Sequence, residues 1–99
     1  MVIEMLQISI KPGMEAAFEQ AAAKGAAVFR RSKGCVGFEL TRSHETPTRY
    51  VLFLTWETLE NHIVDFRASP DRDEWLALVR PFYAEPPKGE HVARVLKAF

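Results

Sequence analysis

Tyr50-Val51-Leu52-Phe53-Leu54 is the stretch that decides the fold of this chain. Its five residues are apolar without interruption, so a strand built from them presents apolar side chains on both faces. The strand extends over residues 49–56, and residues 35–43 predict a second strand before it. The polar linker 44–48, which includes Pro47, joins the two into a hairpin. Both faces of this hairpin therefore need a cover.

The segments before the hairpin predict a strand and a helix. Residues 2–10 form a strand pattern that is mostly apolar on both faces. After the breaker Lys11-Pro12-Gly13, apolar residues recur at three- and four-residue steps and predict a helix through Met14, Phe18, Ala21, Gly25, Val28 and Phe29. Gly34 is suited to the left-handed conformation that ends such a helix.

The segments after the hairpin predict a short helix, a longer helix and a last strand. Thr58 is suited to cap the short helix, one face of which carries Leu59, His62, Ile63 and Phe66. Pro70 takes the favoured first position of the longer helix, whose inward stripe is Trp75, Leu78, Val79 and Phe82. The loop 85–89 is irregular, and residues 91–99 alternate as a strand does.

This order of elements predicts an α+β fold in which residues 1–99 form a single domain. Strand, helix, strand, strand, helix, strand is the ferredoxin-like βαββαβ arrangement, a four-stranded antiparallel sheet with both helices on one face. Helices on one face leave the other face of the apolar 50–54 strand uncovered. A second copy of the same sheet is the simplest cover, so we expect a homodimer that packs sheet against sheet.

Composition excludes several classes of partner. The 99 residues are 47% hydrophobic, and 13 basic and 13 acidic side chains give a net charge of +0. A neutral chain lacks the field that draws proteins to nucleic acid or anionic lipid. Apolar runs are too short for a membrane helix or a signal peptide. The single cysteine, Cys35, excludes an internal disulfide and suits a reducing compartment. We expect a soluble cytoplasmic protein that binds neither nucleic acid nor a membrane.

Several short motifs together point to a known family. They are, in chain order, Lys11-Pro12-Gly13-Met14-Glu15, Gly34-Cys35, Trp56-Glu57-Thr58, Glu60-Asn61-His62 and a last-strand His91. Over nearly its whole length the chain resembles the antibiotic biosynthesis monooxygenase family of dimeric α/β barrels. The resemblance implies the sheet-to-sheet dimeric barrel. It leaves the activity open among cofactor-free oxygenases of polyphenols and quinols, haem-degrading oxygenases and proteins with no assigned reaction.

The chemistry must proceed without the common cofactor motifs. The sequence contains no G-x-G-x-x-G, G-x-x-x-x-G-K-[ST], C-x-x-C or H-E-x-x-H, so we expect neither a cofactor nor a metal. An electron-rich phenol or hydroquinone can still react with dioxygen, because its anion supplies the electron. The protein then needs a base, polar groups that hold the charge and an apolar pocket that excludes water.

His62 is the candidate catalytic base, because it shares the inward helical face and has a pKa suited to neutral pH. Asp65, three residues on, is a candidate to orient its ring. The competing interpretation is a core histidine bonded to a backbone carbonyl. The candidate substrate-binding residues are Gln7, Phe66, Trp75, Val79 and His91. Each has a plainer alternative: the aromatic and aliphatic residues as core, Gln7 and His91 as exposed strand-end residues.

Two further points concern the arginines that are able to bind an anionic substrate and the possibility of haem degradation. Arg72 and Arg94 are suited either to an anionic substrate group or to surface ion pairs. Haem-degrading relatives place an asparagine, a tryptophan and a haem-ligating histidine where this chain has Leu6 or Gln7, His62 and about Trp75, which argues against haem degradation. Three functions stay open: a cofactor-independent monooxygenase of a phenolic, quinol or polyketide-like aromatic substrate, a non-catalytic dimeric module that binds a small aromatic or apolar ligand, and an isomerase or lyase.

Overall fold

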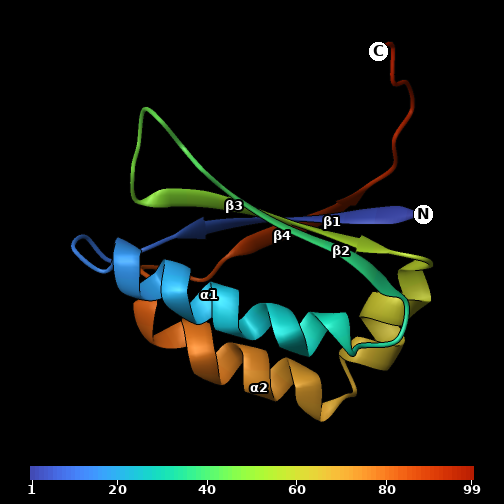
Figure 1. Cartoon of the computed structure of the whole chain (residues 1–99), viewed down its shortest axis with the longest axis horizontal. Helices are drawn as coiled ribbons and strands as arrows, with labels where there is room; N and C mark the ends of the chain where they lie inside the picture. Colours follow the sequence, from blue (N-terminus) through green and yellow to red (C-terminus); the bar gives the residue numbers. More distant parts are fainter.

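The computed structural model describes all 99 residues and arranges them in two layers, a sheet and the helices below it (Figure 1). Its elements are β1 (Val2–Ser9), α1 (Glu15–Arg30), β2 (Cys35–Arg42), β3 (Arg49–Trp56), the π-helix η1 (Asn61–Phe66), α2 (Pro70–Val79), the 3-10 helix η2 (Arg80–Phe82) and β4 (Lys88–Val92). The four strands lie in the order β2-β3-β1-β4, and every neighbouring pair is antiparallel. The predicted ferredoxin-like fold is confirmed.

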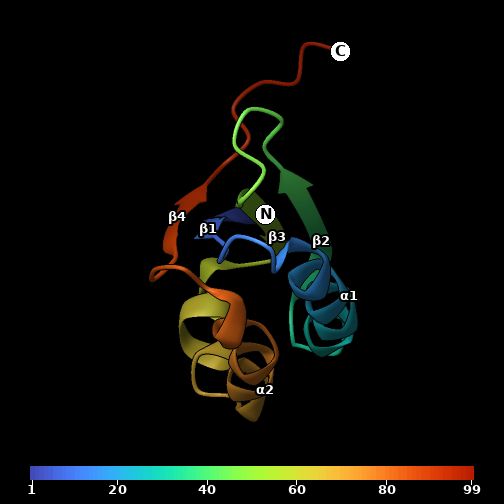
Figure 2. The same cartoon turned by 90° about the vertical axis from the view of Figure 1, so that its left-hand side faces the viewer.

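The side chains of β3 show why this strand organises the sheet. Tyr50, Leu52, Leu54 and Trp56 point toward the helices and are buried, while Val51 and Phe53 lie on the opposite face and are half-buried. Met5 of β1 pairs with Phe53 and adds to that second face. Figure 2 shows both helices on the same side of the sheet. The apolar face that carries Phe53 therefore has no cover within one chain.

Two glycines fix how closely the helices approach. A Cβ built on Gly25 of α1 would lie 2.5 Å from the ring of Trp75, so only glycine allows α1 and α2 to come this near. Gly34 has φ +78 and lies in the left-handed region, but it does not cap α1 as predicted: the helix ends at Arg30, its cap Arg31 is right-handed, and Gly34 lies in the turn that leads into β2. Its bare Cα also makes room for the buried amide of Asn61.

The position of the last strand differs from the prediction. The alternating pattern suggested residues 91–99, whereas β4 is Lys88–Val92 and residues 93–99 are exposed and outside any strand. The reason is the length of its neighbour. Ile3 pairs with Val92 in the antiparallel register, and β1 begins at Val2, so the residues after Val92 meet no further strand of this chain. Figures 1 and 2 show this tail leading away from the helices.

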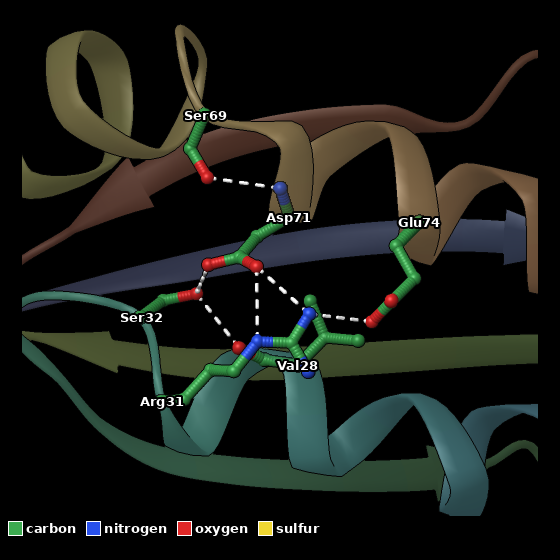
Figure 3. Close-up of polar contacts among 6 residues, drawn as sticks. All are labelled: Val28, Arg31, Ser32, Ser69, Asp71 and Glu74. Atoms are coloured by element: carbon green, nitrogen blue, oxygen red, sulfur yellow. Dashed lines mark hydrogen bonds and ion pairs between the residues drawn. The ribbon is translucent and has the colours of Figure 1, made fainter.

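A polar cluster fastens the end of α1 to the start of α2 (Figure 3). We call it the helix clamp, and it consists of Arg31, Ser32, Ser69, Asp71 and Glu74. The guanidinium of Arg31 donates to Asp71 Oδ1 at 2.8 and 3.0 Å and to Glu74 Oε2 at 2.6 Å. Ser32 Oγ lies 3.0 Å from Asp71 Oδ2, and Ser69 Oγ caps α2 by accepting from Asp71 N at 2.9 Å. The clamp sets how the two helices lie under the sheet.

Candidate functional site

A cavity of about 390 Å³ lies between the sheet and the second helical region, in the size range of small-molecule sites. Strands β1, β3 and β4 contribute one side, and α1, η1 and α2 contribute the other. Its apolar wall is aromatic. Phe29 stacks on Phe66 with ring centroids 5.0 Å apart and meets Trp75 edge to face, also at 5.0 Å. Such a wall suits a flat aromatic ligand.

The polar part of the cavity is a hydrogen-bonded row of three side chains, which we call the Glu4–His62–His91 cluster. His62 Nε2 lies 3.3 Å from Glu4 Oε1, and His62 Nδ1 lies 2.8 Å from His91 Nε2. Trp56 Nε1 donates to the same Glu4 oxygen at 3.1 Å. Glu4 is only 8% exposed, whereas His91 is exposed at the rim. The cluster thus connects a buried carboxyl group with the surface.

Sheet register and a local helix distortion bring the cluster together. Glu4 and His91 are direct cross-strand partners in β1 and β4, so both project from the same face. Thr58 starts the helical region as predicted, because its Oγ1 accepts from Asn61 N at 3.2 Å while Asn61 Oδ1 accepts from Thr58 N at 3.1 Å. The π-helical turn of η1 then places the ring of His62 on Trp56, with centroids 5.4 Å apart.

Burial sets the protonation of this cluster. It lowers the pKa of His62 to about 4, helped by electrostatic repulsion from His91, Arg67 and Arg72. Burial also raises the pKa of Glu4, against the hydrogen bond from Trp56 and the charge of Arg67. His62 is therefore neutral at pH 7, and one of its two ring nitrogens carries no proton.

Two proton arrangements satisfy both hydrogen bonds of His62. With Glu4 ionised, His62 Nε2 donates to Glu4 and His62 Nδ1 accepts from His91. With Glu4 protonated, both hydrogen bonds reverse their direction. A proton can therefore pass between the buried carboxyl group and the exposed imidazole through His62.

The structure brings four of the six predicted site residues to one cavity: His62, Phe66, Trp75 and His91. The other two lie elsewhere. Gln7 is exposed on the sheet face that points away from the helices, because it has the opposite parity to Leu6. Val79 is fully buried in the core below the cavity wall.

The predicted partner of His62 was also wrong. Asp65 accepts from Asn61 Nδ2 at 3.1 Å instead of orienting the imidazole. Glu4 takes that place, and its signal was a lone acidic residue on the otherwise apolar, inward parity of the first strand. Arg72, one of the two candidate arginines, lines the cavity, whereas Arg94 lies in the tail after β4. Tyr83, which had no sequence signal, lines it too.

The structure shows neither a cluster of metal-ligating side chains nor a helix long and apolar enough to cross a membrane. No three histidine, cysteine, aspartate or glutamate side chains gather at the spacing of a metal site. Neither α1 nor α2 reaches the length and hydrophobicity of a helix that crosses a bilayer. Cys35 is a free thiol whose pKa is raised by burial, so it is a poor nucleophile.

Comparison with known proteins gives a family match and a curated relative. The profile of the antibiotic biosynthesis monooxygenase family matches residues 1–78. Bacillus subtilis YczJ, which carries no assigned activity, is 38% identical over 91 residues, covering 92% of this chain and 96% of its own.

Solved structures show the same fold. A Bordetella bronchiseptica protein, provisionally described as an antibiotic biosynthesis monooxygenase, superposes with a TM-score of 0.94 at 46% identity, over 96% of this chain and 97% of its own. SnoaB of Streptomyces nogalater, described as a cofactor-independent oxygenase, superposes with a TM-score of 0.83 at 21% identity, over 98% and 95% of the two chains. At that identity, the likeness to SnoaB concerns the fold.

Proposed function

Because the chain belongs to the antibiotic biosynthesis monooxygenase family, we propose that it is a small cofactor-independent monooxygenase. Its substrate is a phenolic, quinol or polyketide-like aromatic compound, and dioxygen is the second substrate. The observation that carries this proposal is the Glu4–His62–His91 cluster beside an aromatic wall in one cavity. The description of SnoaB as a cofactor-independent oxygenase on the same fold supports it.

The first step is removal of a proton from the substrate hydroxyl. The substrate hydroxyl takes the place of His91 at Nδ1 of neutral His62 and gives this nitrogen its proton, while the proton on His62 Nε2 passes to Glu4. The guanidinium groups of Arg67 and Arg72, which also line the cavity, stabilise the resulting anion. The aromatic wall of Phe66 and Trp75 keeps water from the reacting ring.

The second step is reaction of that anion with dioxygen. The phenolate gives one electron to dioxygen, and the radical pair combines at an ortho or para carbon that carries a hydrogen, which forms a hydroperoxide. One oxygen atom stays on the ring as the new carbonyl of a quinone. The other leaves as water, which takes up the phenolic proton carried by His62 and the ring hydrogen. One dioxygen and one phenol thus give one quinone and one water, with no external reductant.

The proposal includes a homodimer that joins two sheets face to face. Ile3, Met5, Val51 and Phe53 provide an apolar surface on the face that the helices leave open. Phe53→Glu places a charge at the centre of this surface and should give a monomer in analytical ultracentrifugation. A wild-type protein that sediments as a monomer at micromolar concentration would contradict the dimer. Location in the cytoplasm stays a prediction from the sequence.

Oxygen consumption tests the proposed reaction directly. A panel of hydroquinones and polyphenols, including 1,4-dihydroxynaphthalene, is added to the protein in an oxygen electrode, with autoxidation measured in its absence. We expect protein-dependent uptake of one dioxygen per substrate, with loss of at least about a hundredfold in rate in His62→Ala. His44→Ala is the matched control, because His44 is exposed in the β2–β3 loop and does not line the cavity.

The same panel separates the alternatives. No oxygen uptake, together with a ligand that raises the melting temperature, would favour the non-catalytic binding module. Exchange of deuterium into a substrate without oxygen uptake would favour the isomerase or lyase, which the proton-passing cluster also supports. Equal rates in wild type and His62→Ala would remove His62 from the mechanism.

A further inference from the structure

Tyr83 carries the one buried side-chain oxygen in the protein that has no hydrogen-bond partner. An unpaired hydroxyl in such a place costs free energy, because it has lost water and gained nothing in return. Its backbone is nevertheless well held. Tyr83 N donates to Arg80 O at 3.1 Å, and the next residue, Ala84, donates its N–H to Ser9 O at 2.8 Å. The missing partner therefore reflects the surroundings of the side chain and not a loosely held segment.

The surroundings of this side chain are the walls of the cavity. Tyr83 lines the cavity together with Arg72, Leu76 and Pro87, and these four residues also line an outer hollow of about 580 Å³. Tyr83 thus stands between the cavity and the surface. A ligand that enters the cavity meets this residue on the side where both hollows share a wall.

The charges around the cavity favour a ligand with an acidic oxygen. Arg67 and Arg72 line it, and neither belongs to any of the five ion pairs of the protein. Burial and the charge of Glu4 raise the pKa of Tyr83 to about 12, so its hydroxyl remains a donor at neutral pH. Tyr83, with a hydroxyl that has no partner, and two arginines outside any ion pair therefore line the same cavity as the base His62.

On the premise of the proposed function, we propose that Tyr83 positions the substrate by donating a hydrogen bond to an oxygen atom on its aromatic ring. Arg67 and Arg72 then favour ligands in which that oxygen is acidic, as in phenols and enols. Hydrocarbons of the same shape fill the aromatic wall but leave the hydroxyl of Tyr83 unpaired. The inference makes Tyr83 a positioning residue that selects oxygenated rings.

A pair of matched probes tests this selection without turnover. Binding of 2-naphthol and of 2-methylnaphthalene is measured by titration calorimetry under nitrogen, for wild type and for Tyr83→Phe. We expect Tyr83→Phe to weaken 2-naphthol binding about five- to tenfold and to leave 2-methylnaphthalene binding unchanged. The melting temperature should not fall, because the lost hydroxyl makes no hydrogen bond in the free protein.

Tyr50→Phe is the matched control, since Tyr50 is the other tyrosine and its hydroxyl donates to Glu19 Oε2 at 2.6 Å, away from the cavity. It should lower the melting temperature and leave 2-naphthol binding unchanged. Equal binding of 2-naphthol by wild type and Tyr83→Phe would overturn the inference and leave the proposed function standing. If neither probe binds to the wild type, the aromatic-ligand cavity fails, and the proposed function fails with it.

Discussion

The helix clamp and the Glu4–His62–His91 cluster are both polar clusters that join distant segments, but they differ in how their polar groups are paired and exposed to water. In the clamp every charge has a partner, and Arg31 and Glu74 keep 51% and 53% of their side chains exposed. In the cavity Glu4 is almost out of contact with water, and the nearby hydroxyl of Tyr83 has no partner. Groups that only fasten helices are solvated and paired, whereas groups placed for chemistry are desolvated.

The two carboxylates of these clusters shift in opposite directions for this reason. Partial burial alone would raise the pKa of Asp71, but hydrogen bonds from Arg31 and Ser32 hold it below its usual value. Burial dominates at Glu4 and raises its pKa. Asp71 thus stabilises the fold as an anion, while ionisation of Glu4 costs stability.

Gly25→Val should disturb both the helix clamp and the cavity, and we expect it to have the largest effect on stability. The new side chain would overlap the ring of Trp75, which lies on α2 between the clamp and the cavity. We expect a loss of about 2–3 kcal/mol in the free energy of unfolding, measured in urea, because the core is overpacked. Trp75 should also shift into the cavity and abolish 2-naphthol binding.

Ala26→Val is the control for helix propensity, because Ala26 is the neighbouring α1 residue and does not line the cavity. It should cost less than about 1 kcal/mol. Equal losses in the two variants would show that close approach of the helices at Gly25 is unimportant.

Acidification should destabilise the two regions in different pH windows. The folded pKa of His62, about 4, lies below its usual value of 6.5, so between these values the unfolded chain binds a proton that the folded chain does not. Stability therefore falls as the pH drops from 6.5 to 4, by about 1–2 kcal/mol after allowance for the partial exposure of the ring. Urea unfolding of wild type and His62→Gln across this range measures it.

The comparison with His62→Gln is needed because the titration of Glu4 changes the stability of the protein with pH in the opposite direction. Its raised pKa makes stability fall as the pH rises above 4.5. The clamp responds only at lower pH, since the stabilisation from Asp71 is present above 3.8 and is lost as the pH falls through its lowered folded pKa. An identical slope between pH 6.5 and 4 in wild type and His62→Gln would show that His62 titrates as it does in water.

Asp71→Ala should separate the clamp from the cavity. It removes the acceptor of Arg31 and Ser32 and leaves the cap by Ser69 in place. We expect a loss of about 1 kcal/mol, because the pair is partly exposed to water. The measurements are urea unfolding and 2-naphthol binding, and binding should be unchanged. Weaker binding would mean that the clamp also sets the shape of the cavity.

The sequence predicted the fold well because local signals and the sheet agree. The uninterrupted apolar stretch at residues 50–54, the left-handed Gly34 and the helix-starting Pro70 each have one structural solution. The last strand was misplaced because its extent depends on where β1 begins, which its own pattern does not contain. Strand pairing, unlike a cap or a turn, is decided by a distant segment.

The candidate site was predicted in part, for a related reason. Helical spacing put His62 and Phe66 on one inward face, and both line the cavity. In the first strand, Gln7 was predicted to bind substrate but is exposed on the other face, whereas Glu4, of the inward parity, contacts His62. The π-turn of η1 and the unpaired hydroxyl of Tyr83 arise from tertiary packing and leave no local pattern.

Glu4→Gln should have the smallest effect on stability and the opposite sign to Asp71→Ala. The amide oxygen can still accept from Trp56 Nε1, and the neutral side chain avoids the cost of ionisation in the cavity. We expect a gain of about 0.5 kcal/mol or less at pH 8, measured in urea, together with slower oxygen uptake because the carboxyl end of the cluster no longer exchanges a proton.

Asp71→Asn is the matched carboxylate-to-amide change in the clamp, and it should be destabilising at the same pH, because its carboxylate is held by Arg31 as an anion. The two substitutions alter the same atoms and differ only in their surroundings. If both destabilise the protein equally, Glu4 is a structural carboxylate like Asp71, and the distinction between a paired cluster and a desolvated one fails. If Glu4→Gln stabilises the protein and Asp71→Asn destabilises it, the carboxyl group of Glu4 lowers the stability of the fold and serves proton exchange in the cavity.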